Sequence, residues 1–198
     1  MSEPAKRKAT YEDLFNIPEN MTGEIINGEL IVTPRPSRKH IYTASRLDKE
    51  IGPAYELGRG GPGGWIILIE PEIKLGGEHV MVPDLAGWKK ERFPKEEPYN
   101  WISVAPDWVC EILSPTTAIT DKTEKMPIYA QYGVSFLWLV DPINKTLDVF
   151  RLKEGEWVVA GLHLGEARVR AVPFNEIEIN LSDLWLEALS EPPPEQTA

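Results

Sequence analysis

Residues 104–117 read VAPDWVCEILSPTT, and the middle of this stretch is typical of a buried β-strand. Side chains of a strand alternate between its two faces, so Glu111 shares its face with the apolar Val109 and Leu113. An ionised carboxylate in such a setting is costly unless a cation, a hydrogen-bond donor or water accompanies it. Glu111 therefore either pairs with a basic residue at a sheet edge or belongs to a site that binds a cation.

A second carboxylate stands in a similar apolar setting, in HVMVPDLAGW at residues 79–88. Pro83 has no N–H for a sheet, so we expect Asp84 at a sheet edge, a bulge or a strand start; an Asp after Pro is also a common turn residue. Neighbouring strands lie about 4.8 Å apart, which could bring Asp84 and Glu111 to one ion. Such a pair suits Mg²⁺ or Mn²⁺. Asp107 lies about 13 Å from Glu111 by strand rise, so we expect it only at a polar strand start.

The composition of the chain favours one globular domain. Of its 198 residues, 42% are hydrophobic and 26% are charged. We expect a mobile N-terminus at 1–9, a single domain at 10–189 and a disordered, Pro-rich tail at 190–198. Cys110 is the single cysteine and the three histidines are scattered, so a metal must be held by oxygen ligands.

The charge and the apolar runs bear on partners and location. The net charge of −10 opposes non-specific attraction to a polyphosphate. The apolar runs WIILI and FLWLV are too short to span a membrane, and the first residues have no apolar signal core. We therefore expect a cytoplasmic protein that does not enter a membrane.

The N-terminal half predicts a helix, a hairpin and a second helix. YEDLFNIP predicts a short helix after Thr10, and Asn27-Gly28 predicts a tight β-hairpin turn. Apolar residues at three- and four-residue steps predict an amphipathic helix from Ser37 to about Leu57, which Pro53 should kink or end early. The glycine-rich GRGGPGG that follows is read as a flexible connection.

The rest of the chain alternates strands with one helix. Three strands are expected in GWIILIEPEIKL, HVMVPDLAGWK and DWVCEIL, and three more in SFLWLVD, TLDVFRL and EWVVAGL. Between the two groups, a helix near Pro127–Tyr132 should begin close to Lys125, because proline is tolerated only in a first turn. A cation at a helix start is unfavourable, so Lys125 indicates a nearby anion. This order predicts an α/β fold with a mixed β-sheet and an N-terminal β-hairpin.

Several of these segments occur together in one known family. GEIINGELIVTPRPSRKH, VPDLAGW, PDWVCEILSPTT and DKTEKMPIYAQYGVSFLWLVDP follow one another in this order. In this respect the chain resembles the Uma-type family of bacterial endonucleases, within the PD-(D/E)XK restriction-endonuclease-like superfamily. The resemblance covers about residues 10–185 and is most specific from Pro106 to Pro142.

The resemblance implies a fold and a site. The fold is a restriction-endonuclease-like core, a mixed sheet flanked by helices. The metal, Mg²⁺ or Mn²⁺, would be held by Asp84, Glu111 and the backbone carbonyl of Ile112. Glu24 matches an acidic residue of the opening hairpin, and His40 matches a histidine that opens the next helix.

One position departs from the superfamily pattern. The lysine expected two residues after the second acid is replaced by Leu113. Lys125 matches a lysine that this family carries on the following helix, with Tyr129 as support one turn along. The implied catalytic residues are therefore Asp84, Glu111, Lys125 and Glu24.

The implied activity is metal-dependent hydrolysis of phosphodiester bonds in DNA. Two basic groups are candidates for contacts with DNA, namely Lys89, Lys90 and Arg92 after the second carboxylate-bearing strand, and Lys6, Arg7 and Lys8 near the N-terminus. The superfamily suggests that the protein could form a homodimer. The alternative is a non-catalytic structural or regulatory interaction protein on a nuclease-like fold. The acidic composition and Leu113 favour this alternative, whereas the costly carboxylates Asp84 and Glu111 oppose it.

Overall fold

The computed structural model describes residues 7–96 and 98–187, so the tail predicted at 190–198 lies outside the described residues. A six-stranded sheet has the order β10-β9-β8-β7-β6-β3 and consists of β3 (Trp65–Ile69), β6 (Leu85–Lys89), β7 (Trp108–Ile112), β8 (Phe136–Asp141), β9 (Thr146–Lys153) and β10 (Glu156–Leu164). Its β7 and β8 are parallel and the other neighbours are antiparallel. The sheet is therefore mixed, as the sequence predicts.

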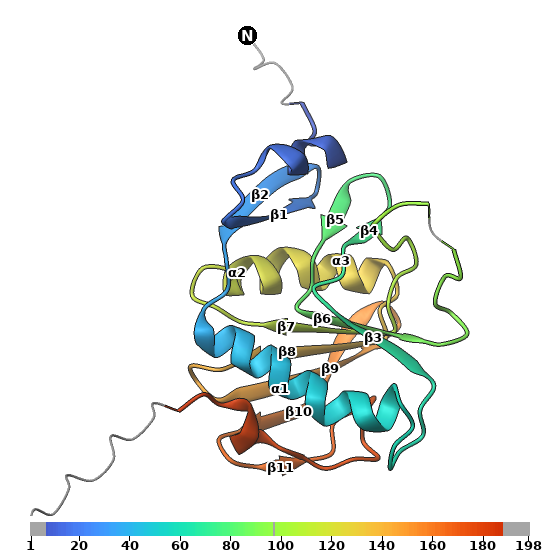
Figure 1. Cartoon of the computed structure of the whole chain (residues 1–198), viewed down its shortest axis with the longest axis vertical. Coiled ribbons are helices and arrows are strands. Elements are labelled where there is room, and N and C mark those ends of the chain that lie inside the picture. The colour runs from blue at the N-terminus through green and yellow to red at the C-terminus, as the bar shows by residue number, and fades with distance from the viewer. Residues whose placement is uncertain (1–6, 97, 188–198) are drawn as a thin grey trace, which may run out of the picture.

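Two smaller sheets accompany it (Figure 1). One has four strands in the order β2-β1-β5-β4, namely β1 (Met21–Ile26), β2 (Glu29–Pro34), β4 (Ile73–Leu75) and β5 (His79–Met81). The other pairs β11 (Arg168–Val169) with β12 (Ile179–Asn180). The helical segments are η1 (Tyr11–Asn16), α1 (Arg38–Tyr55), α2 (Ala118–Thr120), η2 (Asp121–Lys125), α3 (Met126–Gln131) and η3 (Leu181–Leu184).

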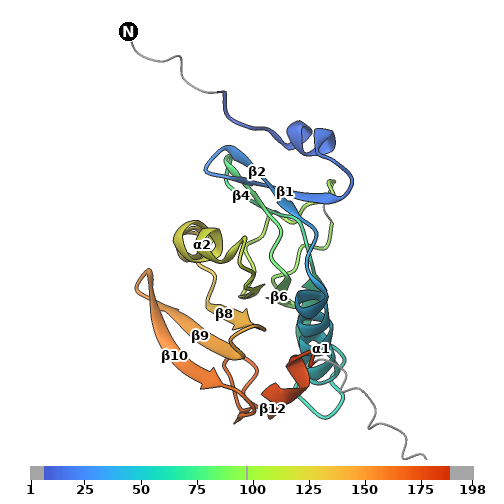
Figure 2. The ribbon, with the colours of Figure 1, turned by 90° about the vertical axis from the view of Figure 1, so that its left-hand side faces the viewer.

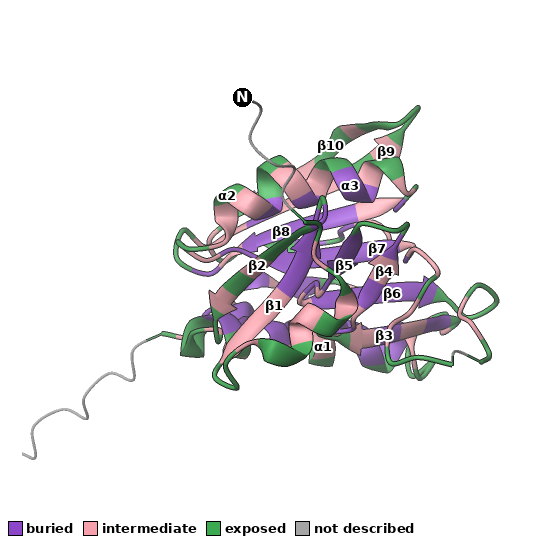
Figure 3. Cartoon of the chain, turned by 90° about the horizontal axis from the view of Figure 1, so that it is seen from above, coloured by how far each residue is buried: buried purple, intermediate pink, exposed green. Residues whose placement is uncertain are grey.

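The six-stranded sheet is covered on both faces. Helix α1 lies on one side and the α2–η2–α3 segment on the other (Figure 2). Trp108, Cys110 and Ile112 of β7 belong to the core on the α1 side, and Val109 belongs to the core on the α3 side. The middle strands β6, β7 and β8 are buried along most of their length (Figure 3). The alternation expected for β7 is thus confirmed, and it leaves Glu111 on the α3 face.

Two of the expected strands are each divided between two sheets. GWIILIEPEIKL contains β3 of the six-stranded sheet and β4 of the four-stranded sheet, with Pro71 between them. HVMVPDLAGWK contains β5 and β6, with Pro83 between them. A proline cannot donate to a ladder, so each becomes the point where the chain passes from one sheet to the other. The second crossing places Asp84 directly before β6, which confirms the expected strand start.

The hairpin and the first long helix form where the sequence predicts them. Asn27 and Gly28 have φ values of 54° and 76°, the left-handed conformation that a two-residue hairpin turn requires. Helix α1 begins after Ser37, whose hydroxyl accepts a hydrogen bond from the His40 N–H. Pro53 lies inside the helix and does not end it at once, since α1 continues to Tyr55.

Of the N-terminal segment 1–9, expected to be mobile, residues 1–6 lie outside the described residues, whereas residues 7–9 make specific contacts. The Ala9 N–H donates to the carbonyl of Gly28 at 2.7 Å, and Arg7 pairs with Asp13. Lys8 pairs with Glu78. Residues 7–9 are therefore held against the hairpin. Within the described residues, no helix is long and apolar enough to cross a membrane.

A glycine in the centre of the sheet is fixed by its neighbours. A Cβ at Gly87 would lie 3.2 Å from ring carbons of both Trp65 and Trp108. These two rings are buried and cannot move aside. We expect Gly87→Val to lower the free energy of unfolding by about 2 kcal/mol, since overpacking a dense core costs roughly 1–3 kcal/mol. Urea denaturation checks this, and Gly77→Val, at an exposed site with open space around the Cβ and no left-handed φ, separates overpacking from the loss of backbone freedom.

Candidate active site

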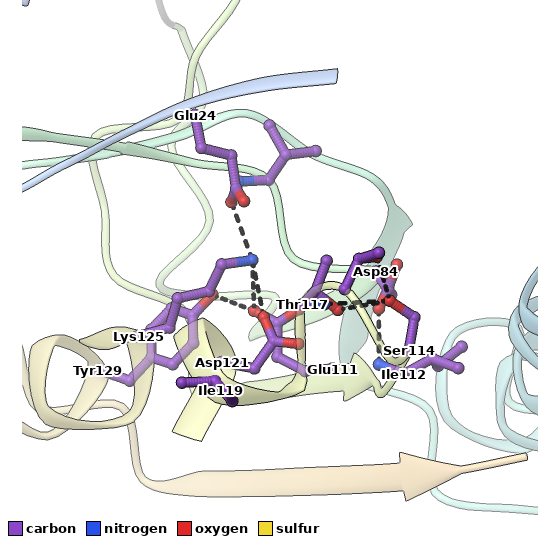
Figure 4. A network of polar contacts seen from close by, with 12 residues as sticks. Glu24, Asp84, Glu111, Ile112, Ser114, Thr117, Ile119, Asp121, Lys125 and Tyr129 are labelled. Atoms are coloured by element: carbon purple, nitrogen blue, oxygen red, sulfur yellow. Dashed lines mark hydrogen bonds and ion pairs between the residues drawn. The ribbon is translucent and has the colours of Figure 1, made fainter. Parts of the chain in front are cut away.

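A pocket of about 330 Å³ lies where the four-stranded sheet, β7 and the α2–η2 segment meet. Its lining includes carboxylates from four separate segments: Glu24 from β1, Asp84 from the start of β6, Glu111 from β7 and Asp121 from η2. Lys125, the last residue of η2, also lines it. The pocket therefore joins these four acidic side chains with one buried ammonium group (Figure 4), and Glu70 and Arg35 complete its charged lining.

Lys125 is the centre of this arrangement. Its side chain is only 5% exposed, and its Nζ lies 3.0 Å from Glu24 Oε1, 3.3 Å from Asp121 Oδ1 and 3.4 Å from Glu111 Oε1. Burial alone would lower the pKa of Lys125, but the charges of Glu111, Glu24 and Asp121 raise it well above its usual value. The lysine is therefore held in its charged form.

Glu111 answers the question that its place in the strand raises. Its side chain accepts a hydrogen bond from the Tyr129 hydroxyl at 2.6 Å, in addition to the contact with Lys125. Burial raises the pKa of Glu111 well above its usual range, and Lys125 opposes this shift. Burial likewise raises the pKa of Tyr129. Glu111 does pair with a basic residue, which is one of the two expectations from the sequence. The pair lies inside a pocket, however, and not at a sheet edge.

Asp84 is held from both of its oxygens. Oδ1 lies 2.5 Å from His40 Nε2, and Oδ2 accepts a hydrogen bond from the Ile112 N–H at 2.6 Å. The second contact shows that Asp84 and β7 are adjacent, as the spacing of neighbouring strands predicts. Nδ1 of His40 is buried and has no hydrogen-bond partner among the residues that the structure describes.

Glu24 links the hairpin to the rest of the site. Its Oε1 accepts a hydrogen bond from the Val82 N–H at 2.7 Å and lies next to the Lys125 ammonium. Strand β1 pairs with β5, and Val82 follows β5 directly. The same crossing that delivers Asp84 to β6 therefore also orients Glu24.

Asp121 is a member of the cluster that the sequence reasoning did not assign to the site. It is buried, and desolvation raises its pKa, with the charge of Lys125 opposing. Its spacing to Lys125, four residues along a helix, is the signal in the sequence that could have indicated this contact.

The helix around Lys125 differs from the expectation. Helical structure begins at Ala118 and continues through η2 and α3 to Gln131, so Lys125 does not lie at a helix start. The segment η2 is a π-helical turn, in which the Met126 N–H donates to the Asp121 carbonyl five residues earlier. This wider turn lies immediately before Pro127, whose missing N–H would break a regular α-helix. The anion near Lys125 is real, but tertiary contacts and not the helix dipole account for it.

Leu113 and Asp107 have the structural roles that their positions suggest. Leu113 is buried in the core with Ile128 and Tyr129, so the superfamily's usual lysine position points into apolar surroundings. Asp107 accepts hydrogen bonds from the Lys89 N–H at 2.8 Å and from Arg92 at 2.5 Å. It holds the loop after β6 and does not line the pocket.

The basic residues expected to contact DNA lie away from the pocket. Lys89 ends β6, whereas Asp84 precedes it, so strand rise separates them by about 17 Å. Lys89 lies over the Trp65 ring and Arg92 pairs with Asp107. Arg35, between β2 and α1, lines the pocket instead.

The mixed sheet flanked by helices agrees with a restriction-endonuclease-like fold, and the comparisons with known proteins identify the same class. Residues 9–182 match the model of the Uma2 family, described as "Putative restriction endonuclease", and the chain belongs to this family. It is similar to the solved structure of a "putative nuclease belonging to DUF820" from Anabaena variabilis ATCC 29413, with 28% identity and a TM-score of 0.72. That match covers 89% of this chain and 97% of the other. No curated protein matches the chain.

Proposed function

We propose that the protein is a metal-dependent endonuclease of the PD-(D/E)XK type that hydrolyses phosphodiester bonds in DNA. The observation that carries the proposal is the buried Lys125 among Glu24, Glu111 and Asp121, with Asp84 in the same pocket. Buried carboxylates cost stability, so a fold gathers them where their charge has a use. The family membership supports the same class of activity.

The charge of the pocket fits a divalent cation. Five carboxylates line the pocket, the four named above and Glu70, against the cationic groups of Lys125 and Arg35, which leaves an excess of negative charge. All the acidic donors are oxygen atoms, the ligands that Mg²⁺ and Mn²⁺ prefer. Within the part of the chain that the structure describes, no group of three or more His, Cys, Asp or Glu side chains is placed to hold an ion alone. This fits Mg²⁺, which is usually held by one or two carboxylates together with waters and substrate phosphates.

In this proposal Asp84 and Glu111 hold the cation, with the carbonyl of Ile112 as a third ligand. A bound divalent cation supplies Lewis acidity, which polarises a phosphoryl oxygen and makes a bound water more acidic. His40 and the Ile112 N–H fix the orientation of the Asp84 carboxylate. Tyr129 fixes Glu111 in the same way.

Lys125 stabilises the negative charge that develops on the phosphoryl oxygens or orients the attacking water. Glu24 contacts Lys125 directly and acts on the reaction through it or as an outer ligand. The approach of a polyanion to an acidic chain requires local positive charge. Arg35, at the pocket, provides this positive charge in place of the distant residues Lys89, Lys90 and Arg92.

Metal binding and cleavage test the proposal together. An ion that binds only the folded protein at about 100 times its Kd stabilises it by about 2.7 kcal/mol. We therefore expect millimolar Mg²⁺ or Mn²⁺ to raise the melting temperature, and the same ions to support cleavage of single-stranded, duplex or branched DNA. Chelation with EDTA should abolish both effects.

The rival is a non-catalytic interaction protein on the same fold, which the acidic composition favours. It predicts neither a thermal shift with metal nor metal-dependent cleavage of any DNA form. That combined result from purified protein would decide against the nuclease. The homodimer suggested by the superfamily stays a prediction, which sedimentation equilibrium checks.

A further inference from the structure

A second hollow lies directly beside the candidate active site. It has a volume of about 360 Å³ and is bounded by helix α1 and the end of β3. Its own wall is mostly apolar and is formed by Ile41, Ala44 and Ser45 of α1 and by Ile69 of β3. It shares residues with the acidic pocket, namely Arg35, Pro36, His40, Glu70 and Asp84. The two hollows are therefore one continuous depression with two chemically different halves.

The apolar half is open to solvent. Ile41 is 54% exposed and Ile69 is 51% exposed, and the two residues come from different elements on either side of the hollow. Single exposed aliphatic residues are common on protein surfaces. Two that line one pocket next to a cluster of acids form an apolar surface that is suited to a ligand. His40 and Asp84 stand at the boundary between the two halves.

We propose that this apolar half binds an unpaired nucleobase of the nucleotide next to the scissile phosphate, so that the substrate is single-stranded or locally opened DNA. This inference rests on the proposed function and specifies its substrate. When the scissile phosphate lies in the acidic half, the nucleoside attached to it is no more than one nucleotide length away. It therefore reaches the adjoining apolar half. The face of a base is apolar and packs against aliphatic side chains, whereas a base inside a duplex is stacked on its neighbours.

The charge at the junction is mixed, with Arg35 beside the carboxylates of Glu70 and Asp84, and it is Arg35 that supports the same occupant. Arg35 borders both halves, where its guanidinium group can contact the phosphate that links the bound base to the next nucleotide. Because the chain has a net charge of −10, the electrostatic attraction that usually dominates binding to DNA is weak here. Apolar contact with a base supplies affinity that does not depend on the phosphates.

The test compares DNA with and without bases. The probes are a fluorescein-labelled single-stranded dodecamer and a dodecamer of the same backbone in which every sugar is abasic. Fluorescence anisotropy with Ca²⁺ in place of Mg²⁺ or Mn²⁺ keeps a divalent cation among the carboxylates of the pocket and limits cleavage during the measurement. We expect the wild type to bind the normal strand about tenfold more tightly than the abasic strand, which corresponds to about 1.4 kcal/mol. The two probes carry the same backbone charge. At one fixed salt concentration, a difference between their affinities therefore arises from the bases.

The variant Ile41→Gln/Ile69→Gln removes the apolar surface without adding charge. Both side chains are more than half exposed, so we expect the fold to be retained, and the melting temperature verifies this. The variant should bind the two probes within about twofold of each other and show a raised KM with an unchanged kcat. Ile143→Gln is the matched control, because Ile143 is 56% exposed and does not line the hollow. It should discriminate between the probes as the wild type does.

Two results would overturn the inference and are distinguishable. Equal binding of both probes by a wild-type protein that still cleaves DNA refutes the base subsite and leaves the nuclease intact. A wild-type protein that neither binds nor cleaves any DNA refutes the proposed function, and the subsite with it.

Discussion

Replacing Lys125 by methionine is expected to lower the free energy of unfolding by about 3–5 kcal/mol, the usual effect of removing one partner from a buried ion pair. The ammonium group contacts Glu24, Glu111 and Asp121, and its side chain is almost completely buried. Methionine has a similar volume and leaves no cavity, so the loss arises from the unpaired carboxylates. Chemical denaturation of the metal-free protein measures it.

The loss of stability in Lys125→Met should depend on pH in a defined direction. Burial raises the pKa of Glu111 and of Asp121, so above their ordinary pKa values the folded state binds more protons than the unfolded state. Stability then falls as pH rises, and it falls more steeply in Lys125→Met because no cation opposes the shift. The difference between the variant and the wild type should therefore be smaller at pH of about 5 than at about 8.

Lys122→Met is the control for this experiment, because Lys122 lies in the same helical turn but is exposed. Its free energy of unfolding should change by no more than about 0.5 kcal/mol. If Lys125→Met is as stable as this control at neutral pH, then water solvates the carboxylates in the variant. The contacts of Lys125 with them would then make no net contribution to the free energy of unfolding.

The second large effect concerns activity. Asp84→Ala and Glu111→Gln should each reduce kcat/KM for metal-dependent DNA cleavage by at least about 100-fold, since each removes a proposed ligand of the cation. Asp107→Asn should retain activity, although Asp107 follows a proline as Asp84 does. Initial rates at saturating Mn²⁺ provide the comparison.

The stability of Glu111→Gln separates a catalytic loss from a folding defect. Because the pKa of Glu111 is raised by burial, its ionised form costs stability above the ordinary pKa, and glutamine removes that cost. The variant should be at least as stable as the wild type without metal while it loses activity. Unimpaired cleavage by both site variants would refute the proposed metal site.

Much of the fold follows from local patterns. The hairpin at Asn27-Gly28 depends on two residues that tolerate a left-handed backbone, and helix α1 depends on its apolar spacing and the Ser37 cap. Both signals act over a few residues, so they can be read before any tertiary contact is known. The division of two strands between sheets was missed, because a proline shows where a ladder stops but not which sheet the chain joins next.

The candidate site divides in a similar way. Glu111 and Asp84 are conspicuous because a carboxylate in an apolar strand is costly wherever the chain folds. Asp121 looked like an ordinary helix residue, and only its burial against Lys125 shows otherwise. His40 gave no local indication that it would contact Asp84, which lies in a distant part of the chain.

The sequence by itself therefore determined the α/β alternation, the two misplaced carboxylates and the family to which the chain belongs. The tertiary structure alone decided that Lys125 meets three acids, that the Lys89 group lies at the far end of β6, and that an apolar hollow adjoins the site. Local patterns depend on neighbours within a few residues. Ion pairs and pockets depend on which distant segments pack together, and this is specified by the whole core.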